Sequence, residues 1–454
     1  MAHAGDAPQP QLTLSDFKSE SLRGAAGFIR VGQTRAGQWW LLDARNRAFF
    51  SRGVGSVNRS GRGGGRSARP GPYTLAVDQL HGTEDPQKFV GSVLRRLRAW
   101  HANTLGAWTT SEFFDRGMFY TEILEFRKIA PETTIKLGGA MLPDVFNPAW
   151  VEACDQWASA LCLPRRESRE LIGYFTDNEL GWAQAGAAVP ASGKGAARPA
   201  PLTLLQICLS LEPSFPAYHA AWEFALAAHG GELDALAQAW ELDLPNKEAL
   251  RQLTRSDVAV TSPGYARDQE RFTREFARRY FTVCSTAIRR YDPQHLVLGC
   301  RFAGPPPPAV VAECLHPLVD VISVNEGREP LTSWLDEGND AAGMPVLLSE
   351  FSWTRESFTR RLAAGERQAG LTTVERMLAQ GRAAFERAAI HPAVVGYAWP
   401  RWADAAEDQP PFGSGLVHID DGEAREHTEL FSDLNARAAT LRATAVHASS
   451  SSPK

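Results

Sequence analysis

Residues 171–182 read LIGYFTDNELGW, a short apolar run followed at once by Asp177, Asn178 and Glu179. An apolar run of this length between polar segments is typical of a buried strand. A carboxylate at the end of such a strand would be costly to bury unless it faced a polar cavity. The stretch therefore predicts a strand that delivers polar side chains to one edge of a sheet.

On both sides of this stretch, strand-length apolar runs alternate with longer segments of helical spacing. In Phe89–Ala102, Phe272–Tyr291 and Thr372–Ala389, apolar residues recur every three or four positions. Strands that alternate with helices pair in parallel, because each crossover returns the chain to the same sheet edge. Eight such units predict an α/β fold, a closed (β/α)8 TIM barrel. The expected strands are Phe49–Val57, Thr104–Trp108, Thr134–Ala140, Leu171–Thr176, His295–Phe302, Val319–Asn325, Pro345–Phe351 and Val394–Trp399.

The alternation is interrupted once, between Thr176 and His295. Leu202–Leu211, Ser214–Gly230 and Leu233–Glu241 are spaced like helices there, so we expect a helical insertion on the barrel rim after strand four. The expected domain organisation is an N-terminal extension (1–38), a barrel (39–442) that includes a loop and helical insertion at 183–260, and a flexible tail (443–454).

Composition restricts the class of protein. The chain has 454 residues, 44% of them hydrophobic, and a formal net charge of -4, which argues against general disorder and against a nucleic-acid or anionic-membrane partner. The sequence shows neither a signal peptide nor an apolar run of about 18 residues, so we expect a cytoplasmic protein with no membrane span. The six cysteines form no CxxC pair and the histidines no HExxH motif, and we expect neither a metal nor a cofactor.

A second predicted strand ends like the first. Residues 345–353 read PVLLSEFSW and place Glu350 at the end of strand seven. The carboxyl ends of barrel strands meet at one face, where active sites of this fold lie. Glycoside hydrolysis with retention needs two carboxyl groups about 5–5.5 Å apart, one as acid and one as nucleophile, whereas inversion needs roughly 6.5–9.5 Å. Glu179 and Glu350 are therefore candidates for such a pair.

These motifs resemble clan A of the retaining glycoside hydrolases, most closely the β-agarases of glycoside hydrolase family 50 and more distantly the β-galactosidases of family 42. The resemblance runs in order through most of residues 39–435. It rests on WWLLDARNRAFFSRGVGSVN (39–58), RLRAWHANTLGAW (96–108), YFTDNELGW (174–182), ELDALAQAWEL (232–242), YDPQHLVLGCRF (291–302), VISVNEG (321–327), PVLLSEFSW (345–353) and GYAWPRWAD (396–404).

The resemblance implies a hydrolase that cleaves β-glycosidic bonds of a galactose-type oligo- or polysaccharide by double displacement. It implies Glu179 as the acid/base and Glu350 as the nucleophile. It also implies that Asn178 contacts the sugar 2-hydroxyl and that Trp399 forms an aromatic platform under the sugar. Further candidate substrate contacts are Trp108, Arg301, Asn325 and Glu326.

The chain departs from the clan pattern after strand six. Many members carry a tyrosine there that holds the nucleophile, whereas this chain reads VNEG at 324–327. Glu326 adds a carboxylate that could raise the pKa of the nucleophile by like-charge repulsion. Two alternatives therefore stay open: a barrel that binds or senses sugars without turnover, and a transglycosylase that uses the same carboxylates. The sequence leaves the oligomeric state open.

Overall fold

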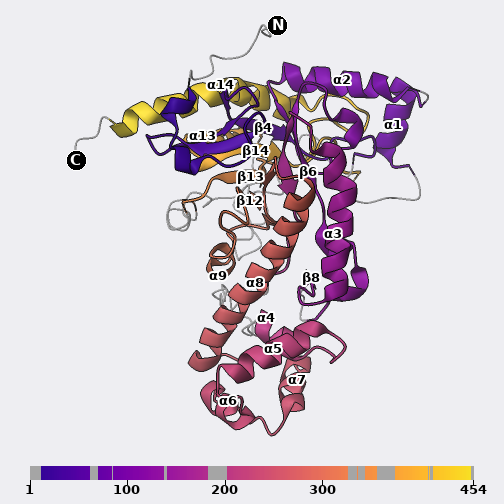
Figure 1. Ribbon diagram of the computed structural model, residues 1–454. Helices are drawn as coiled ribbons and strands as arrows, with labels where there is room; N and C mark the ends of the chain where they lie inside the picture. Colours follow the sequence, from indigo (N-terminus) through magenta and orange to yellow (C-terminus); the bar gives the residue numbers. More distant parts are fainter. Residues whose placement is uncertain are drawn as a thin grey trace.

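A curled parallel sheet forms the centre of the fold (Figure 1). The computed structural model describes residues 12–61, 70–83, 85–137, 141–182, 202–325, 335, 343–354, 374–406, 408 and 413–450. Within them the sheet has the order β10-β9-β6-β5-β4-β14-β13-β12-β11, with every neighbouring pair parallel. Its strands are β4 (Ser51–Val54), β5 (Thr104–Leu105), β6 (Phe119–Ile123), β9 (Leu171–Phe175), β10 (Leu296–Val297), β11 (Arg301–Phe302), β12 (Ile322–Asn325), β13 (Val346–Glu350) and β14 (Val394–Trp399).

The sheet closes on itself through its two outermost strands. β10 pairs with β9 and β11 pairs with β12, yet only Leu298, Gly299 and Cys300 separate β10 from β11 in the chain. They are two halves of the fifth barrel strand. Backbone bonds from Thr176 N to Gly299 O (2.9 Å) and from Glu179 N to Arg301 O (2.8 Å) continue the pairing between the fourth and fifth strands. The fold is therefore a (β/α)8 barrel, as predicted.

The third barrel strand differs from the prediction. It is β6, whereas the segment predicted for it contributes only β7 (Thr134–Ile135), which pairs antiparallel with β8 (Leu142–Pro143); residues 138–140 lie outside the described part. The sequence of β6, FYTEI, contains a threonine and a glutamate, and Glu122 is only partly buried. A strand that is incompletely covered lacks the continuous apolar run by which the other strands were identified.

Helices surround the sheet. α8 spans 29 residues and leads into β10, so its first turn lies at the carboxyl end of the barrel. α4, α5 and α6 pack against α8, and Figure 1 shows α5, α6 and α7 beyond that end. The helices are α1 (Pro72–His81), α2 (Pro86–Ala99), α3 (Pro148–Cys162), α4 (Leu204–Leu209), α5 (Pro216–Ala227), α6 (Leu233–Trp240), α7 (Lys247–Arg255), α8 (Pro263–Tyr291), α9 (Pro308–Val311), α13 (Val374–Ile390) and α14 (Arg425–Ser450).

The opposite end of the barrel is covered by a small antiparallel sheet. It consists of β1 (Arg30–Gln33), β2 (Trp39–Leu42) and β3 (Ala48–Phe49). Trp39 N donates to Pro392 O just before β14, which places β2 at the amino ends of the barrel strands. β1 lies within the predicted N-terminal extension and pairs with β2 in the predicted barrel unit, while α14 continues past residue 442 to Ser450.

Candidate active site

The predicted site residues meet at the carboxyl ends of four neighbouring strands. Glu179 follows β9, Arg301 opens β11, Asn325 ends β12 and Glu350 ends β13. An isolated parallel bridge aligns Asn178 with Arg301. The β12–β13 register shifts between Val324 and Asn325, so that Asn325 lies opposite Glu350. The local strand geometry therefore brings these side chains together.

Arg301 is the central cation of the site. Its side chain is only 2% exposed. One terminal nitrogen, Nη2, donates to Glu350 Oε1 (3.0 Å) and to Ser349 O (2.8 Å), and the other, Nη1, donates to Asn178 Oδ1 (2.8 Å). The guanidinium lies 4.5 Å from the ring centroid of Trp108, within cation–π range. Both terminal nitrogens of the guanidinium are therefore hydrogen-bonded to protein oxygens.

Asn325 connects the two carboxylate-bearing segments. Its Nδ2 donates to Glu179 Oε1 (2.9 Å) and to Asn178 Oδ1 (3.1 Å), and its Oδ1 accepts from Ser349 Oγ (2.8 Å). Asn178 Oδ1 therefore accepts from both Arg301 and Asn325. This fixes the direction of the Asn178 amide, with the oxygen toward these two donors and the nitrogen on the other side.

The two glutamates differ in their surroundings. Glu179 is exposed, whereas the Glu350 side chain is 29% exposed and pairs with Arg301. Burial raises the pKa of Glu350 above its usual range, the nearby charge of Glu179 acts in the same direction, and Arg301 and, more weakly, Arg401 act against it. The site thus holds one solvated carboxylate and one partly desolvated carboxylate whose charges influence each other.

Backbone strain is present at the same ends of the strands. Glu179 has φ +47°, Trp108 after β5 has φ +59° and Ser56 after β4 has φ +55°. Positive φ is uncommon for residues other than glycine, and for a bulky residue such as tryptophan it is an outlier. Strained residues of this kind cluster at functional sites. Their positions support the assignment of this face as the site.

The aromatic candidates occupy different positions. Trp108 is partly buried and covers one face of Arg301. Trp399 has no exposed surface; its Nε1 donates to Ser414 O (3.0 Å) and its ring packs edge-on against Trp353 (4.7 Å between centroids). The expectation that Trp399 presents an open platform is therefore not met in this arrangement, because neighbouring side chains cover the ring. Glu326 lies outside the described residues.

Asp177 anchors the segment that carries Asn178 and Glu179. It is buried and accepts from Tyr280 Oη of α8 (2.7 Å) and, through both carboxylate oxygens, from Arg127 N (3.0 and 3.2 Å). Burial raises the pKa of Asp177 to about 7 despite these bonds. The end of β9 is thus fixed from two sides, by the loop after β6 and by α8.

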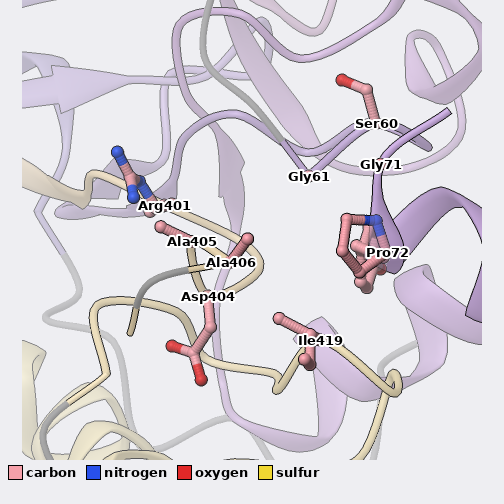
Figure 2. Close-up of a pocket in the computed structure, with 10 residues that line it drawn as sticks. Ser60, Gly61, Gly71, Pro72, Arg401, Asp404, Ala405, Ala406 and Ile419 are labelled. Carbon is pink, nitrogen blue, oxygen red and sulfur yellow. The ribbon is translucent and has the colours of Figure 1, made fainter. Parts of the chain in front are cut away.

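A cavity of about 320 Å³ opens between the segments that follow β4 and β14. Figure 2 shows Ser60, Gly61, Gly71 and Pro72 from the first segment and Arg401, Asp404, Ala405 and Ala406 from the second. Arg401 donates to Ser414 Oγ (3.3 Å), and its charge reaches Glu350. Because β4 and β14 are neighbours, this cavity lies on the same face of the barrel as the two glutamates.

Two residues that contribute to the candidate site were not predicted from the sequence. Ser349 orients Asn325, and Arg401 adds positive charge near Glu350. Ser349 directly precedes a predicted site residue, but successive side chains of a strand point to opposite faces, so the sequence alone does not place Ser349 beside Glu350 in the site. Among the described residues, no three His, Cys, Asp or Glu side chains form a group that could hold a metal.

Comparisons with known proteins place the chain near one group of enzymes. No protein-family model matches it. It is 25% identical over 293 residues to β-agarase A of Vibrio sp. (strain JT0107), covering 62% of this chain but only 28% of that protein. In the described part of the chain, no helix is long and apolar enough to cross a membrane.

Solved structures share the fold. PfGH50B has a TM-score of 0.73 at 19% identity, over 97% of this chain and 70% of that one. An exo-β-agarase has a TM-score of 0.72 at 18% identity, over 97% and 68%. At these identities the structural likeness shows the fold alone, a TIM barrel of the kind found in glycoside hydrolases. The relative found by sequence is a β-agarase.

Proposed function

We propose that this chain is a retaining glycoside hydrolase in which Glu179 is the acid/base and Glu350 is the nucleophile. The observation that carries the proposal is a continuous set of hydrogen bonds between the two carboxylates. It runs from Glu179 through Asn325, Asn178 and Arg301 to Glu350. Double displacement needs two carboxyl groups on one face of the barrel, and this set of hydrogen bonds supports Glu179 and Glu350 as that pair.

In double displacement the two carboxyl groups take different roles. Glu350, partly desolvated and held by Arg301, attacks the anomeric carbon and forms a glycosyl ester while the leaving oxygen departs. Glu179, open to solvent, gives its proton to that oxygen and then takes a proton from the water that hydrolyses the ester. Asn178 would direct its amide nitrogen toward a substrate oxygen, in keeping with a 2-hydroxyl contact.

The proposed substrate is a β-linked, galactose-type oligo- or polysaccharide. The sequence likeness to a β-agarase and the shared fold with an exo-β-agarase support this class. Arg301 and Asn325 have their hydrogen bonds within the protein, so direct sugar contacts fall to Asn178 and to the exposed part of Trp108.

Hydrolysis of aryl β-galactosides and of galactan oligosaccharides tests the proposal. Glu350→Gln is expected to lose activity by about a thousand-fold or more, and Glu179→Gln by about a hundred- to ten-thousand-fold. Glu179→Gln should lose least on aryl groups that leave without protonation. Glu152→Gln, an exposed carboxylate on α3, is the matched control and should retain full activity.

The anomer formed first, followed by proton NMR, tests the stereochemistry. Retention supports double displacement, whereas inversion would rule it out. Tight sugar binding by the wild type without turnover would favour a sensor over a hydrolase. Product elongation at high acceptor concentration would favour a transglycosylase.

A further inference from the structure

Arg301 lies beneath the site rather than in it. It was expected to contact substrate, yet its side chain is 2% exposed and both terminal nitrogens are bonded to protein oxygens. The rings of Trp108 and Phe175 lie 4.5 and 5.4 Å from the guanidinium carbon. A sugar could reach this group only by displacing Trp108 or Glu350.

We propose that Arg301 is a positioning residue that keeps Glu350 charged and aimed for attack, in place of the tyrosine that strand six lacks. This inference rests on the proposed function for the role of Glu350 as nucleophile. It assigns to strand five a task that the sequence led us to seek on strand six, where Asn325 contacts Glu179 instead.

The charge balance around Glu350 supports this role. Among the described residues, three charged groups act on it from the elements packed around it: Arg301 on β11, Glu179 after β9 and Arg401 after β14. Burial and Glu179 favour the protonated form, while the two arginines favour the carboxylate. Of the two arginines, Arg301 alone is in hydrogen-bond contact with Glu350, at 3.0 Å. A protonated Glu350 could not act as a nucleophile.

Geometry supports the aiming role. Nη2 of Arg301 binds Ser349 O and Glu350 Oε1 together, which ties the carboxylate to the backbone of its own strand. Nη1 binds Asn178 next to the acid/base. A lysine at this position would keep the charge but offer no planar fork with which to hold Glu350 and Asn178 at the same time.

The test compares Arg301→Met, Arg301→Lys and a control, Arg289→Met. Arg289 pairs with the buried Asp320 (2.9 Å) at the end of α8 that leads into β10, so its loss removes a similar ion pair at the other end of the barrel. The pH profile of kcat/KM for an aryl β-galactoside reports the pKa of the nucleophile in the free enzyme on its acidic limb.

In Arg301→Met we expect this limb to move upward by about one pH unit or more, because the cation that offsets burial is gone. Arg301→Lys should recover part of that shift but not the wild-type rate, and Arg289→Met should leave the limb in place. A folded Arg301→Met variant whose acidic limb coincides with that of the wild type would overturn the proposal.

A second readout needs no turnover. It is the free energy of unfolding, measured across pH in the wild-type and in the Arg301→Met backgrounds. In each background, the difference between the Glu350→Gln variant and its parent, which keeps Glu350, reports the pKa of Glu350 by linkage. The Glu350→Gln variant should become more stable relative to its parent as pH rises. This rise should continue to higher pH when Arg301 is absent. If no glycoside is hydrolysed, the proposed function fails, while this comparison still decides whether Arg301 controls the charge of Glu350; an identical pH dependence in both backgrounds would exclude it.

Discussion

Two buried arginines, at opposite ends of the barrel, show how one side chain serves different purposes. Arg301 at the carboxyl end bonds to the carboxylate of Glu350. Arg442 of α14, at the amino end, donates within the described part of the chain to backbone oxygens alone: those of Ala389, His391, Pro392 and Trp39. Both lie over aromatic rings, Arg301 over Trp108 and Arg442 over Trp40 at 4.8 Å.

The difference lies in what balances the charge. Carbonyl dipoles near the end of α13 attract a cation, but they do not titrate. Burial lowers the pKa of Arg442 to about 9, with no acidic neighbour acting against it. Burial also lowers the pKa of Arg301, but Glu350 and Glu179 both oppose that change. The amino end of the barrel thus uses an arginine to fix structure, and the carboxyl end uses one to set the charge of a reactive group.

The largest expected effect follows from the loss of Arg442, the arginine that fixes structure. Arg442→Met should lower the free energy of unfolding by about 2–4 kcal/mol, because carbonyls at the end of α13 and in β2 lose a buried donor. Urea unfolding measures this cost. The acidic limb of the kcat/KM profile should stay where it is in the wild type; a displaced limb would show that the two ends of the barrel are electrostatically coupled.

Asp177 sharpens the comparison, since it is a buried carboxylate at the carboxyl end that forms no ion pair with any residue the structure describes. Its pKa of about 7 lies well above the usual range of an aspartate, so the folded state binds the proton more tightly than the unfolded state. The stability that this tighter proton binding gives to the folded state is fully present below about pH 4 and is lost as pH rises toward 7. Asp177→Asn should therefore gain stability relative to the wild type by about 2 kcal/mol between pH 5 and pH 7.

Urea unfolding at the two pH values measures this difference, with Asp155→Asn, a partly exposed carboxylate on α3, as the control. A constant difference between Asp177→Asn and the wild type would mean that Asp177 stays ionised in the folded protein. The substitution should also reduce kcat, since Tyr280 and Arg127 lose part of their hold on the segment that carries Glu179.

The smallest expected effect concerns Arg401, whose charge reaches Glu350 from the neighbouring cavity without a hydrogen bond. Arg401→Gln should move the acidic limb of kcat/KM upward by about a few tenths of a pH unit, in the same direction as the loss of Arg301. The shift should shrink in high salt, because Arg401 is partly exposed. A shift as large as that of Arg301→Met would contradict this distinction between Arg301, which contacts Glu350, and Arg401, which acts on it only through its charge.

The sequence predicted the barrel and several of its strands well. β14 matches its predicted segment residue for residue, and Glu179 and Glu350 lie at the expected strand ends. Continuous apolar runs identify strands that are buried on both faces. β6 was missed because it is only partly covered, and the apolar residues near Thr134 belong to a short hairpin instead.

The parts of the site that the sequence could not reveal depend on tertiary packing. Nothing in the local sequence indicates that Trp399 is covered by Trp353, or that Arg301 points at Glu350 rather than at a ligand. Ser349 Oγ donates to Asn325 on the neighbouring strand, a contact that depends on how β12 and β13 pair. Residue type and position along a strand predict which end of the barrel a side chain occupies, but not which neighbour takes up its hydrogen bonds.

The division of the fifth strand into β10 and β11 has a consequence for assembly. β10 joins the half of the wall that leads back to β4, and β11 joins the half that carries Glu350. Arg301 therefore sits at the seam where the two halves meet. A folding intermediate in which the two halves had not yet joined would keep Arg301 with Glu350 but leave Asn178 and Glu179 apart from them, so competence for chemistry should emerge only in the final joining step.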